Sequence, residues 1–286
     1  MVFCLDADSL ASGKLISLTD RSVRPIMNPL QRALIEKLGH DHGFEHVLPG
    51  EETAVVLASA LHSARIVIRR PNAGEFFVEI QSAIPALASE VTRAFPDATQ
   101  GGAKFRFHDE AGLARMLRRT AALAQALPHQ PVQIYEAQVD AALKTLPTGD
   151  IATTEIERLI RQRVGQRAFR EAMLHYWNGA CAVTGVKVSE VLRASHAKPW
   201  AECESDEERL DVFNGFLLCA HLDALFDRFL ISFDDEGRLL LSPTVSSQDQ
   251  ATLGLDQSLR LRWLTPMHRM YLLYHRERFK SVSAAK

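Results

Sequence analysis

Four polar side chains in the second half of the sequence have the types and spacing needed for metal-assisted hydrolysis of a phosphodiester. His196 follows a short apolar run, Asn214 stands eighteen residues later, and Asp223 and Asp227 stand nine and thirteen residues after the asparagine. This chemistry requires a base that activates water, a cation that stabilises the developing negative charge, and a group that orients the base. An imidazole titrates near neutral pH and suits the first role.

The surrounding residues predict two strands and a helix that would bring this set together. The apolar run before His196 predicts one strand, and Gly215–Cys219 predicts a second strand that pairs with it. His221–Phe229 predicts a helix with Asp223 and Asp227 one turn apart on the same face. Two carboxylates form an oxygen site of the kind that Mg²⁺ or Mn²⁺ prefers, whereas histidine ligands would favour Zn²⁺ or Ni²⁺.

Several short motifs in this region appear together in an order typical of one nuclease family. The sequence resembles the HNH endonucleases, specifically the branch without zinc-binding CxxC pairs, and the resemblance covers roughly residues 154–280. It implies the ββα-metal fold and a divalent cation. The motifs that carry it are ACAVTG (180–185), ASHAKPW (194–200), RLDVFNGFLLC (209–219) and LDALFDRFLISF (222–233).

The resemblance implies a role for each of the four residues. His196 would be the general base that polarises water for attack on phosphorus. Asn214 would be the middle residue of the HNH triad, holding the loop that bears the base and orienting the imidazole. Asp223 would be a metal ligand where many members have the last histidine of the triad, and Asp227 would match a further ligand position.

Two positions complicate the metal site that the resemblance implies. Ser195 stands where many members carry an aspartate or histidine ligand, and a neutral hydroxyl is a weak ligand, so metal affinity would be lower or water would fill the gap. His221 competes with Asp223 for the last letter of the motif. The spacing from Asn214 favours Asp223, and His221 is the lower-ranked candidate.

Each of these residues also has a purely structural interpretation. A histidine shortly before a proline is often only hydrogen-bonded within the fold. Asn214 followed by Gly215 is a common turn pair. The two aspartates, or His221, would then lie on a solvated helix face. The order and spacing of the set favour catalysis over these interpretations.

The sequence predicts an α+β fold in two domains, 1–147 and 154–286. The first would hold a helix begun by Asn28 and Pro29, a hairpin of 65–70 and 76–81, and helices over 82–95, 110–127 and 133–143. Proline, glycine and small polar residues in 145–153 place the boundary. The second would begin with two helices, 154–164 and 166–177, and close on a helix begun by Thr265 and Pro266.

Composition limits the class of protein. The formal charge is −2, which does not suggest a protein that coats nucleic acid nonspecifically, although a neutral total can hide a basic groove. No apolar run approaches a membrane span of about 20 residues, and the start lacks the pattern of a secretory signal. The four scattered cysteines suggest free thiols. A cytoplasmic protein without membrane contact is therefore expected.

These observations lead to one main hypothesis with two alternatives. The main hypothesis is a DNA endonuclease whose first domain directs or regulates cutting; a restriction or anti-phage role is analogy with the family. The alternatives are a nuclease-derived DNA-binding protein without catalysis, and an effector nuclease gated by a ligand at the first domain. DNA is the expected partner, and a homodimer is left open. Arginine-rich segments would contact phosphates, the named candidates being Arg163, Arg167 and Arg193.

Overall fold

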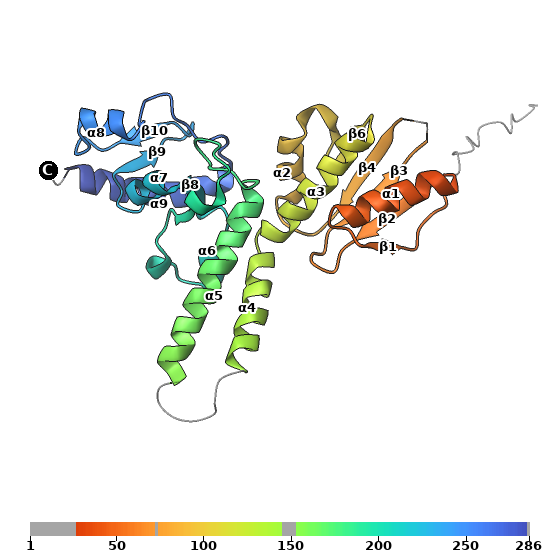
Figure 1. Cartoon of the computed structure of the whole chain (residues 1–286), viewed down its shortest axis with the longest axis horizontal. Helices are drawn as coiled ribbons and strands as arrows, with labels where there is room; N and C mark the ends of the chain where they lie inside the picture. The colour runs from red at the N-terminus through yellow and green to blue at the C-terminus, as the bar shows by residue number, and fades with distance from the viewer. Residues whose placement is uncertain (1–26, 72–73, 145–152, 285–286) are drawn as a thin grey trace, which may run out of the picture.

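The computed structural model describes residues 27–71, 74–144 and 153–284. These residues form a six-stranded antiparallel sheet with helices, two long helices that lie side by side, and a second mixed unit with two small sheets (Figure 1). The combination of helices and strands confirms the predicted α+β class. The two-stranded sheet that carries His196 belongs to the second unit.

The first unit is built on one continuous sheet. Neighbouring strands are antiparallel in the order β1-β2-β3-β4-β6-β5. Strand residues that point toward the helices alternate with outward-pointing residues, which buries Val55, Ile66 and Val78. The strands are β1 (His46–Leu48), β2 (Ala54–Ala58), β3 (Arg65–Arg69), β4 (Phe76–Gln81), β5 (Thr99–Gly101) and β6 (Lys104–Phe107). β3 and β4 form the hairpin predicted for 65–70 and 76–81.

Helices cover one face of this sheet. α1 (Pro29–Asp41) contacts β2, and α3 (Glu110–Ala126) contacts β6 and α1 (Figure 1). The side chain of Asn28 accepts from the backbone N–H of Gln31 at 2.8 Å, and Asp109 accepts from that of Gly112. These caps satisfy N–H groups that have no partner inside the helix, which explains why the helices begin at the predicted residues.

The helix predicted for 82–95 is shorter in the structure. α2 spans Leu87–Ala94, followed by the short 3₁₀ helix η1 (Pro96–Ala98). The prediction was wrong at its start because Ala86 has φ 62°, a left-handed conformation that a right-handed helix cannot contain.

One long helix replaces the two predicted for 154–164 and 166–177. α5 (Thr153–Tyr176) runs unbroken beside α4 (Gln130–Leu143). Gly165 does not interrupt it: a Cβ there would lie 2.3 Å from a ring carbon of Trp200, so the glycine lets that ring approach the helix. The helical pattern predicts Ile156 and Leu159 on the core face, but they are 41% and 47% exposed. Residues 145–152 of the predicted boundary lie outside the described residues.

The second unit packs around the end of α5. Tyr176 and Trp177 are fully buried there, among Phe213, Phe216 and Trp263. Its elements are η2 (Ser189–Val191), β7 (Leu192–His196), η3 (Trp200–Glu202), α6 (Asp206–Leu210), β8 (Gly215–Cys219), α7 (Ala220–Phe226), β9 (Ile231–Phe233), β10 (Leu239–Leu241), α8 (Ser247–Thr252) and α9 (Pro266–Ala284). The expected closing helix and the hairpin around Gly237 are both present.

The end of α5 also joins the two units. Arg119 of α3 donates to the carbonyl oxygens of His175 and Tyr176, each at 2.8 Å. The Tyr176 hydroxyl donates to a carboxylate oxygen of buried Glu90 on α2 at 3.2 Å. Hydrogen bonds to charged groups are stronger than neutral ones, so these contacts fix α5 against the first unit.

Candidate active site

The residues around His196 form the predicted strand, strand and helix. β7 and β8 pair antiparallel with His196 opposite Gly215, and α7 follows β8 directly. The register places Asn214 just before β8, where its carbonyl oxygen accepts from the N–H of Ala197 at 3.0 Å. The base candidate and the asparagine therefore meet at one end of the hairpin.

The close pairing at this end requires glycine. A Cβ on Gly215 would lie 2.0 Å from the carbonyl oxygen of Ser195, which is backbone and cannot turn away. Gly215→Ala should therefore lower the free energy of unfolding by about 2 kcal/mol or more, as overpacking does, measured by urea denaturation. Gly254→Ala is the control: its Cβ would meet nothing within 4 Å, leaving only its left-handed backbone, φ 64°, as a cost. Equal stability of Gly215→Ala and wild type would contradict the register.

His196 is held on three sides. Its ring stacks on Phe169 of α5, with centroids 3.8 Å apart, and its edge meets Trp200 at 5.7 Å. Its Nε2 lies 2.8 Å from the carbonyl oxygen of Arg209. A carbonyl can only accept, so Nε2 carries the hydrogen. In the neutral ring the lone pair is then on Nδ1, which is the atom able to take a proton.

The surroundings of His196 keep the ring neutral. Burial lowers the pKa of His196 to about 4, while the Arg209 carbonyl acts in the opposite direction because it favours the charged form. At pH 7 the imidazole is therefore unprotonated at Nδ1. This is the protonation state that a general base requires before it accepts a proton from water.

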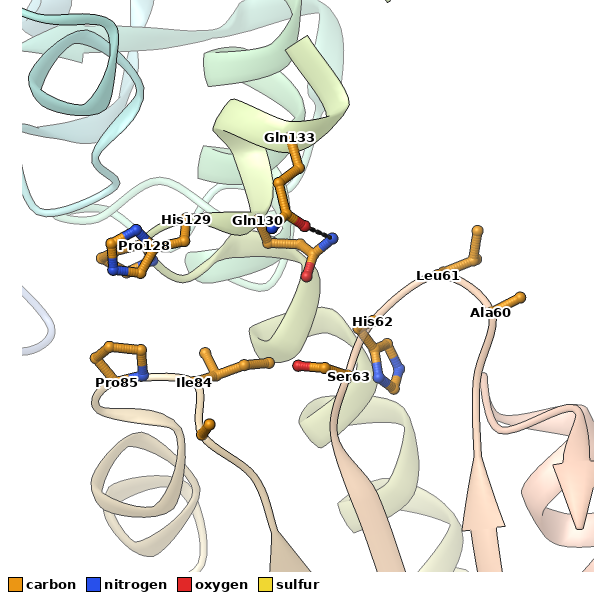
Figure 2. A pocket seen from close by; sticks show the side chains of 11 residues that line it. Ala60, Leu61, His62, Ser63, Ile84, Pro85, Pro128, His129, Gln130 and Gln133 are labelled. Atoms are coloured by element: carbon orange, nitrogen blue, oxygen red, sulfur yellow. Dashed lines mark hydrogen bonds between the residues drawn. The ribbon is translucent and has the colours of Figure 1, made fainter. Parts of the chain in front are cut away.

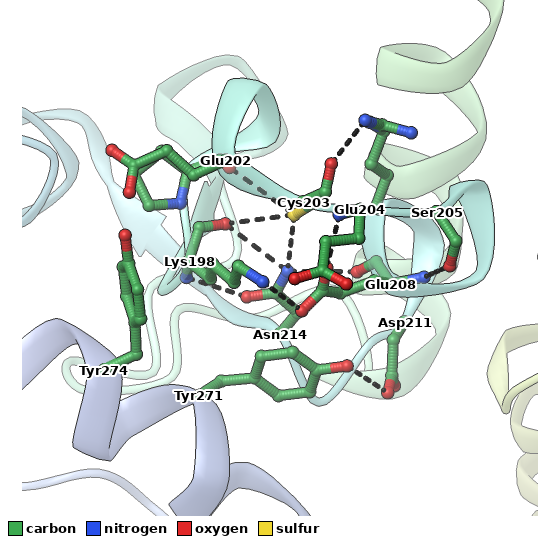
Figure 3. A network of polar contacts seen from close by, with 12 residues as sticks. Lys198, Glu202, Cys203, Glu204, Ser205, Glu208, Asp211, Asn214, Tyr271 and Tyr274 are labelled. Atoms are coloured by element: carbon green, nitrogen blue, oxygen red, sulfur yellow. Dashed lines mark hydrogen bonds and ion pairs between the residues drawn. The ribbon is translucent and has the colours of Figure 1, made fainter.

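Asn214 fastens the loop between the two strands. Its side chain is fully buried; the amide oxygen accepts from the N–H of Lys198 at 2.8 Å, and the amide nitrogen donates to the carbonyl of Glu208 at 3.0 Å (Figure 3). Glu208 precedes Arg209, whose carbonyl holds His196. Among the described residues, Asn214 is not hydrogen-bonded to the imidazole and acts on it through the backbone of the loop.

Asp223 lies in the first turn of α7 and Asp227 is its C-cap. Asp227 donates its backbone N–H to the carbonyl of Asp223 at 2.9 Å, which sets the carboxylates one turn apart. The Ser195 hydroxyl donates to a carboxylate oxygen of Asp223. Loss of water around the carboxyl and repulsion by the Asp223 charge raise the pKa of Asp227 to about 6, despite the opposing charge of Arg228.

One pocket contains both the base and a carboxylate. It has a volume of about 300 Å³, and His196 and Asp227 both line it. Trp200 and Phe229 provide apolar walls. The remaining lining residues are Ala194 and Pro199. The structure thus brings together a neutral imidazole and an acidic side chain from elements that are 31 residues apart in sequence, counting from 196 to 227.

A divalent cation fits the donor set here only with added water. Ser195, Asp223 and Asp227 offer oxygen atoms alone, which suits Mg²⁺ or Mn²⁺, because Mg²⁺ keeps several waters and needs one or two carboxylates. Among the described residues, no group of three or more His, Cys, Asp and Glu side chains is placed to hold a metal ion. A Zn²⁺ or Ni²⁺ site with histidine ligands therefore has less support.

The lower-ranked candidates lie outside this pocket. His221 is exposed at the start of α7. Arg193 donates to the carbonyls of Glu190 and Leu192, and Arg167 donates to Gln138 of α4 at 2.7 Å. Arg163 is exposed on α5.

Three residues of the site were not singled out from the sequence. Phe169 stacks on the base, Arg209 supplies the carbonyl that fixes its tautomer, and Trp200 forms a pocket wall. In the sequence, only the proline before Trp200 and the position of Trp200 four residues after His196 indicate that it lies near the histidine. The other two contacts come from a helix and a loop that the sequence does not connect to the histidine.

A buried histidine of α9 supports the end of α7. His275 donates from Nε2 to the carbonyl oxygen of Phe226 at 3.0 Å and accepts at Nδ1 from the hydroxyl of Ser232 at 3.0 Å. Its ring also stacks on Phe226, with centroids 3.7 Å apart. Phe226 precedes Asp227, so α9 and β9 hold this carboxylate in place. In the neutral ring Nε2 carries the hydrogen and Nδ1 is the acceptor for the Ser232 hydroxyl.

Acid should therefore weaken the fold through His275. Burial lowers the pKa of His275 from 6.5 to about 4. Between these two pH values the imidazole is protonated in the unfolded chain and neutral in the folded chain. Above pH 6.5 this group does not change the free energy of unfolding. As the pH drops toward 4 the free energy of unfolding falls, and at pH 5 it is about 2 kcal/mol lower. His275→Gln should show a shallower loss between pH 7 and pH 5 in urea denaturation. Parallel curves for variant and wild type would refute this.

The fold and the site together define a nuclease-type ββα unit, in which a β-hairpin ends in a histidine and the following helix carries two carboxylates. Residues 181–234 match the family model described as HNH endonuclease. This confirms the HNH endonuclease family for this part of the chain, and HNH nucleases generally use a divalent metal ion. No curated protein matches the chain.

Proposed function

We propose that this protein is a divalent-metal-dependent DNA endonuclease that hydrolyses phosphodiester bonds in the pocket of His196 and Asp227. The observation that carries the proposal is that a neutral imidazole with a free Nδ1 and an acidic side chain line the same pocket. The HNH match supports the reaction class. Fold alone does not establish activity, so the argument rests on these side chains.

The residues divide the reaction between them. Nδ1 of His196 takes the proton from the attacking water, while its Nε2–H remains on the Arg209 carbonyl and stabilises the charged ring. Asn214 keeps that carbonyl in place through Glu208. Asp223 and Asp227 would hold the cation, which when bound supplies positive charge against the charge developing on the phosphate.

The test is nicking of supercoiled plasmid DNA by the full chain. Cutting should require Mg²⁺, Mn²⁺ or Ni²⁺ and stop with a chelator. No nicking with any of these cations, on plain or modified phage DNA, would overturn the proposal. The remaining interpretation would then be a nuclease-derived DNA-binding protein without catalysis, which the weak metal ligand Ser195 also favours. A restriction or defence role, a cytoplasmic location and a homodimer stay predictions.

A gated nuclease is the second candidate because a pocket lies between loops of the six-stranded sheet and the start of α4. It has a volume of about 430 Å³, and Figure 2 shows Ser63 and Ile84 on one side with Gln130 and Gln133 on the other. Gln130 begins α4, which packs along α5, and α5 carries Phe169 against His196. A ligand here could bias the base through these helices. Nicking that appears only with added cell extract would favour this candidate.

The division into domains 1–147 and 154–286 is likewise a proposal. It is supported by separate sheets before and after α5. No helix in the described part of the chain is long and apolar enough to cross a membrane.

A further inference from the structure

The face of the six-stranded sheet that is turned away from α1 and α3 carries a cluster of positive charge. The strand pairing aligns Arg69, Phe77 and Arg106 in one row and places Lys104 opposite Glu79 in the next. Because side chains alternate along a strand, these residues share one face, and Arg65 joins them four residues from Arg69. This set is called the basic sheet face below.

The basic sheet face has a net positive charge in a protein that is negative overall. On β3, β4 and β6 it holds four cations and one acid, Glu79, so its local charge is 4 − 1 = +3, against −2 for the whole chain. Glu79 lies 3.6 Å from Arg69 and offsets that one charge. Arg65, Lys104 and Arg106 are exposed and form no ion pair within the described residues.

Many arginines elsewhere are already engaged. Arg161 pairs with Glu157, Arg276 with Asp235 and Arg278 with Glu202. Arg262 donates to three backbone carbonyls, those of Trp177, Ala180 and Cys181. These groups support the fold of α5 and α9, which reduces the support for the arginine-rich helices as the main phosphate surface. On the sheet, by contrast, Arg65, Lys104 and Arg106 have no ion pair within the described residues.

The dimensions of the face suit a nucleic-acid backbone. Arg65 and Arg69 are about 13 Å apart at the usual rise along a strand, and Arg69 and Arg106 about 10 Å apart across two strand spacings. Along one strand of duplex DNA, phosphates recur about every 3.4 Å of helix axis, so the face spans about four of them. Half-buried Phe77 lies between the two arginines, beside a hollow of about 630 Å³ that Gln100 and Thr53 also line.

We infer that the basic sheet face is a second DNA-binding surface, distant in the fold from the hairpin of His196, which holds the phosphate backbone of duplex DNA. Arg65, Lys104 and Arg106 contact phosphates, and Phe77 packs against the sugar or base edge between them. The inference deepens the proposed function and rests on it for the choice of DNA. It gives the first domain the task of anchoring the substrate that the HNH unit cuts.

The experiment compares two triple variants of the full chain. The first is Arg65→Gln, Lys104→Gln and Arg106→Gln. The matched control removes the same charge from the helices on the opposite side of the sheet, through Lys37→Gln, Arg115→Gln and Arg118→Gln. Binding of labelled duplex DNA is measured by fluorescence anisotropy in EDTA, which prevents cation-dependent cutting, between about 50 and 200 mM salt.

The sheet variant should bind about tenfold more weakly or worse at about 100 mM salt, and its slope of log affinity against log salt should be shallower by about three. The control should keep the wild-type slope. Equal slopes for both triple variants would overturn the inference. So would a sheet variant with wild-type affinity and lower thermal stability, because these side chains would then stabilise the fold and not bind DNA.

A parallel nicking assay with Mg²⁺ separates this inference from the proposed function. If no protein cuts but the sheet variant alone loses affinity, the anchoring surface stands and the nuclease proposal fails. If the wild type cuts and both variants bind alike, the nuclease proposal stands and the anchoring surface is refuted.

Discussion

Replacing His196 by Ala is expected to slow plasmid nicking by about 10²–10⁴-fold, the usual contribution of a general base. The reason is specific to one atom: Nδ1 is the lone-pair nitrogen because Nε2 donates to the Arg209 carbonyl. The measurement is the initial rate of conversion of supercoiled to open-circular plasmid at saturating Mg²⁺ or Mn²⁺.

His196→Gln separates loss of the base from loss of packing. A glutamine amide can still donate to the Arg209 carbonyl, but it has no nitrogen able to take a proton at neutral pH. It should cut as slowly as the alanine variant while its urea denaturation stays closer to wild type. His40→Ala, an exposed histidine of α1, is the control and should cut at the wild-type rate. A His196→Gln variant with wild-type rate would remove the histidine from the mechanism.

Replacing Asp223 and Asp227 together by Asn should reduce cation-dependent nicking to the level seen with a chelator. Asn keeps the shape of each side chain and removes the negative charge that Mg²⁺ or Mn²⁺ would neutralise. The same variant should also lose any rise in melting temperature that the cation gives the wild type, since a ligand that binds only the folded state stabilises it. That second readout does not depend on activity.

The two single variants should differ in stability in the absence of cation. Repulsion and lost hydration raise the pKa of Asp227, so Asp227→Asn should stabilise the cation-free protein at pH 8. Asp223→Asn keeps an acceptor for the Ser195 hydroxyl and should fold normally. Unchanged cutting by Asp223→Asn would transfer the ligand role to His221, which lies two residues earlier on α7.

The effect of Ser195 on metal binding helps to decide whether the protein is an active enzyme or an inactive relative. A hydroxyl that donates to Asp223 consumes one lone pair of that carboxylate, which a cation would otherwise use. If metal binding is weak, the cation dependence of nicking should be shifted to high concentration without loss of the maximal rate. This pattern would distinguish a weak site from a catalytically dead one.

Local chemistry was enough to predict much of the fold and the composition of the site. The caps Asn28 and Asp109 begin α1 and α3 where expected, because the signal and the N–H groups it satisfies lie within three residues. Two β-like runs joined by residues typical of a turn predicted β3 and β4. The spacing of His196, Asn214 and the aspartates predicted the strand, strand and helix, and the match over residues 181–234 confirms the family.

Only the tertiary structure decided how these parts act. The tautomer of His196 depends on a carbonyl thirteen residues away, and its ring stacks on Phe169 of α5. Gly165 of the same helix leaves room for Trp200. Asn214 binds the loop and makes no bond to the imidazole. Arg161 of α5 is paired with Glu157, whereas the sheet presents cations from β3 and β6 on one face. Sequence spacing determines which residues share a strand or a helix; packing between distant segments determines which atoms remain available for chemistry.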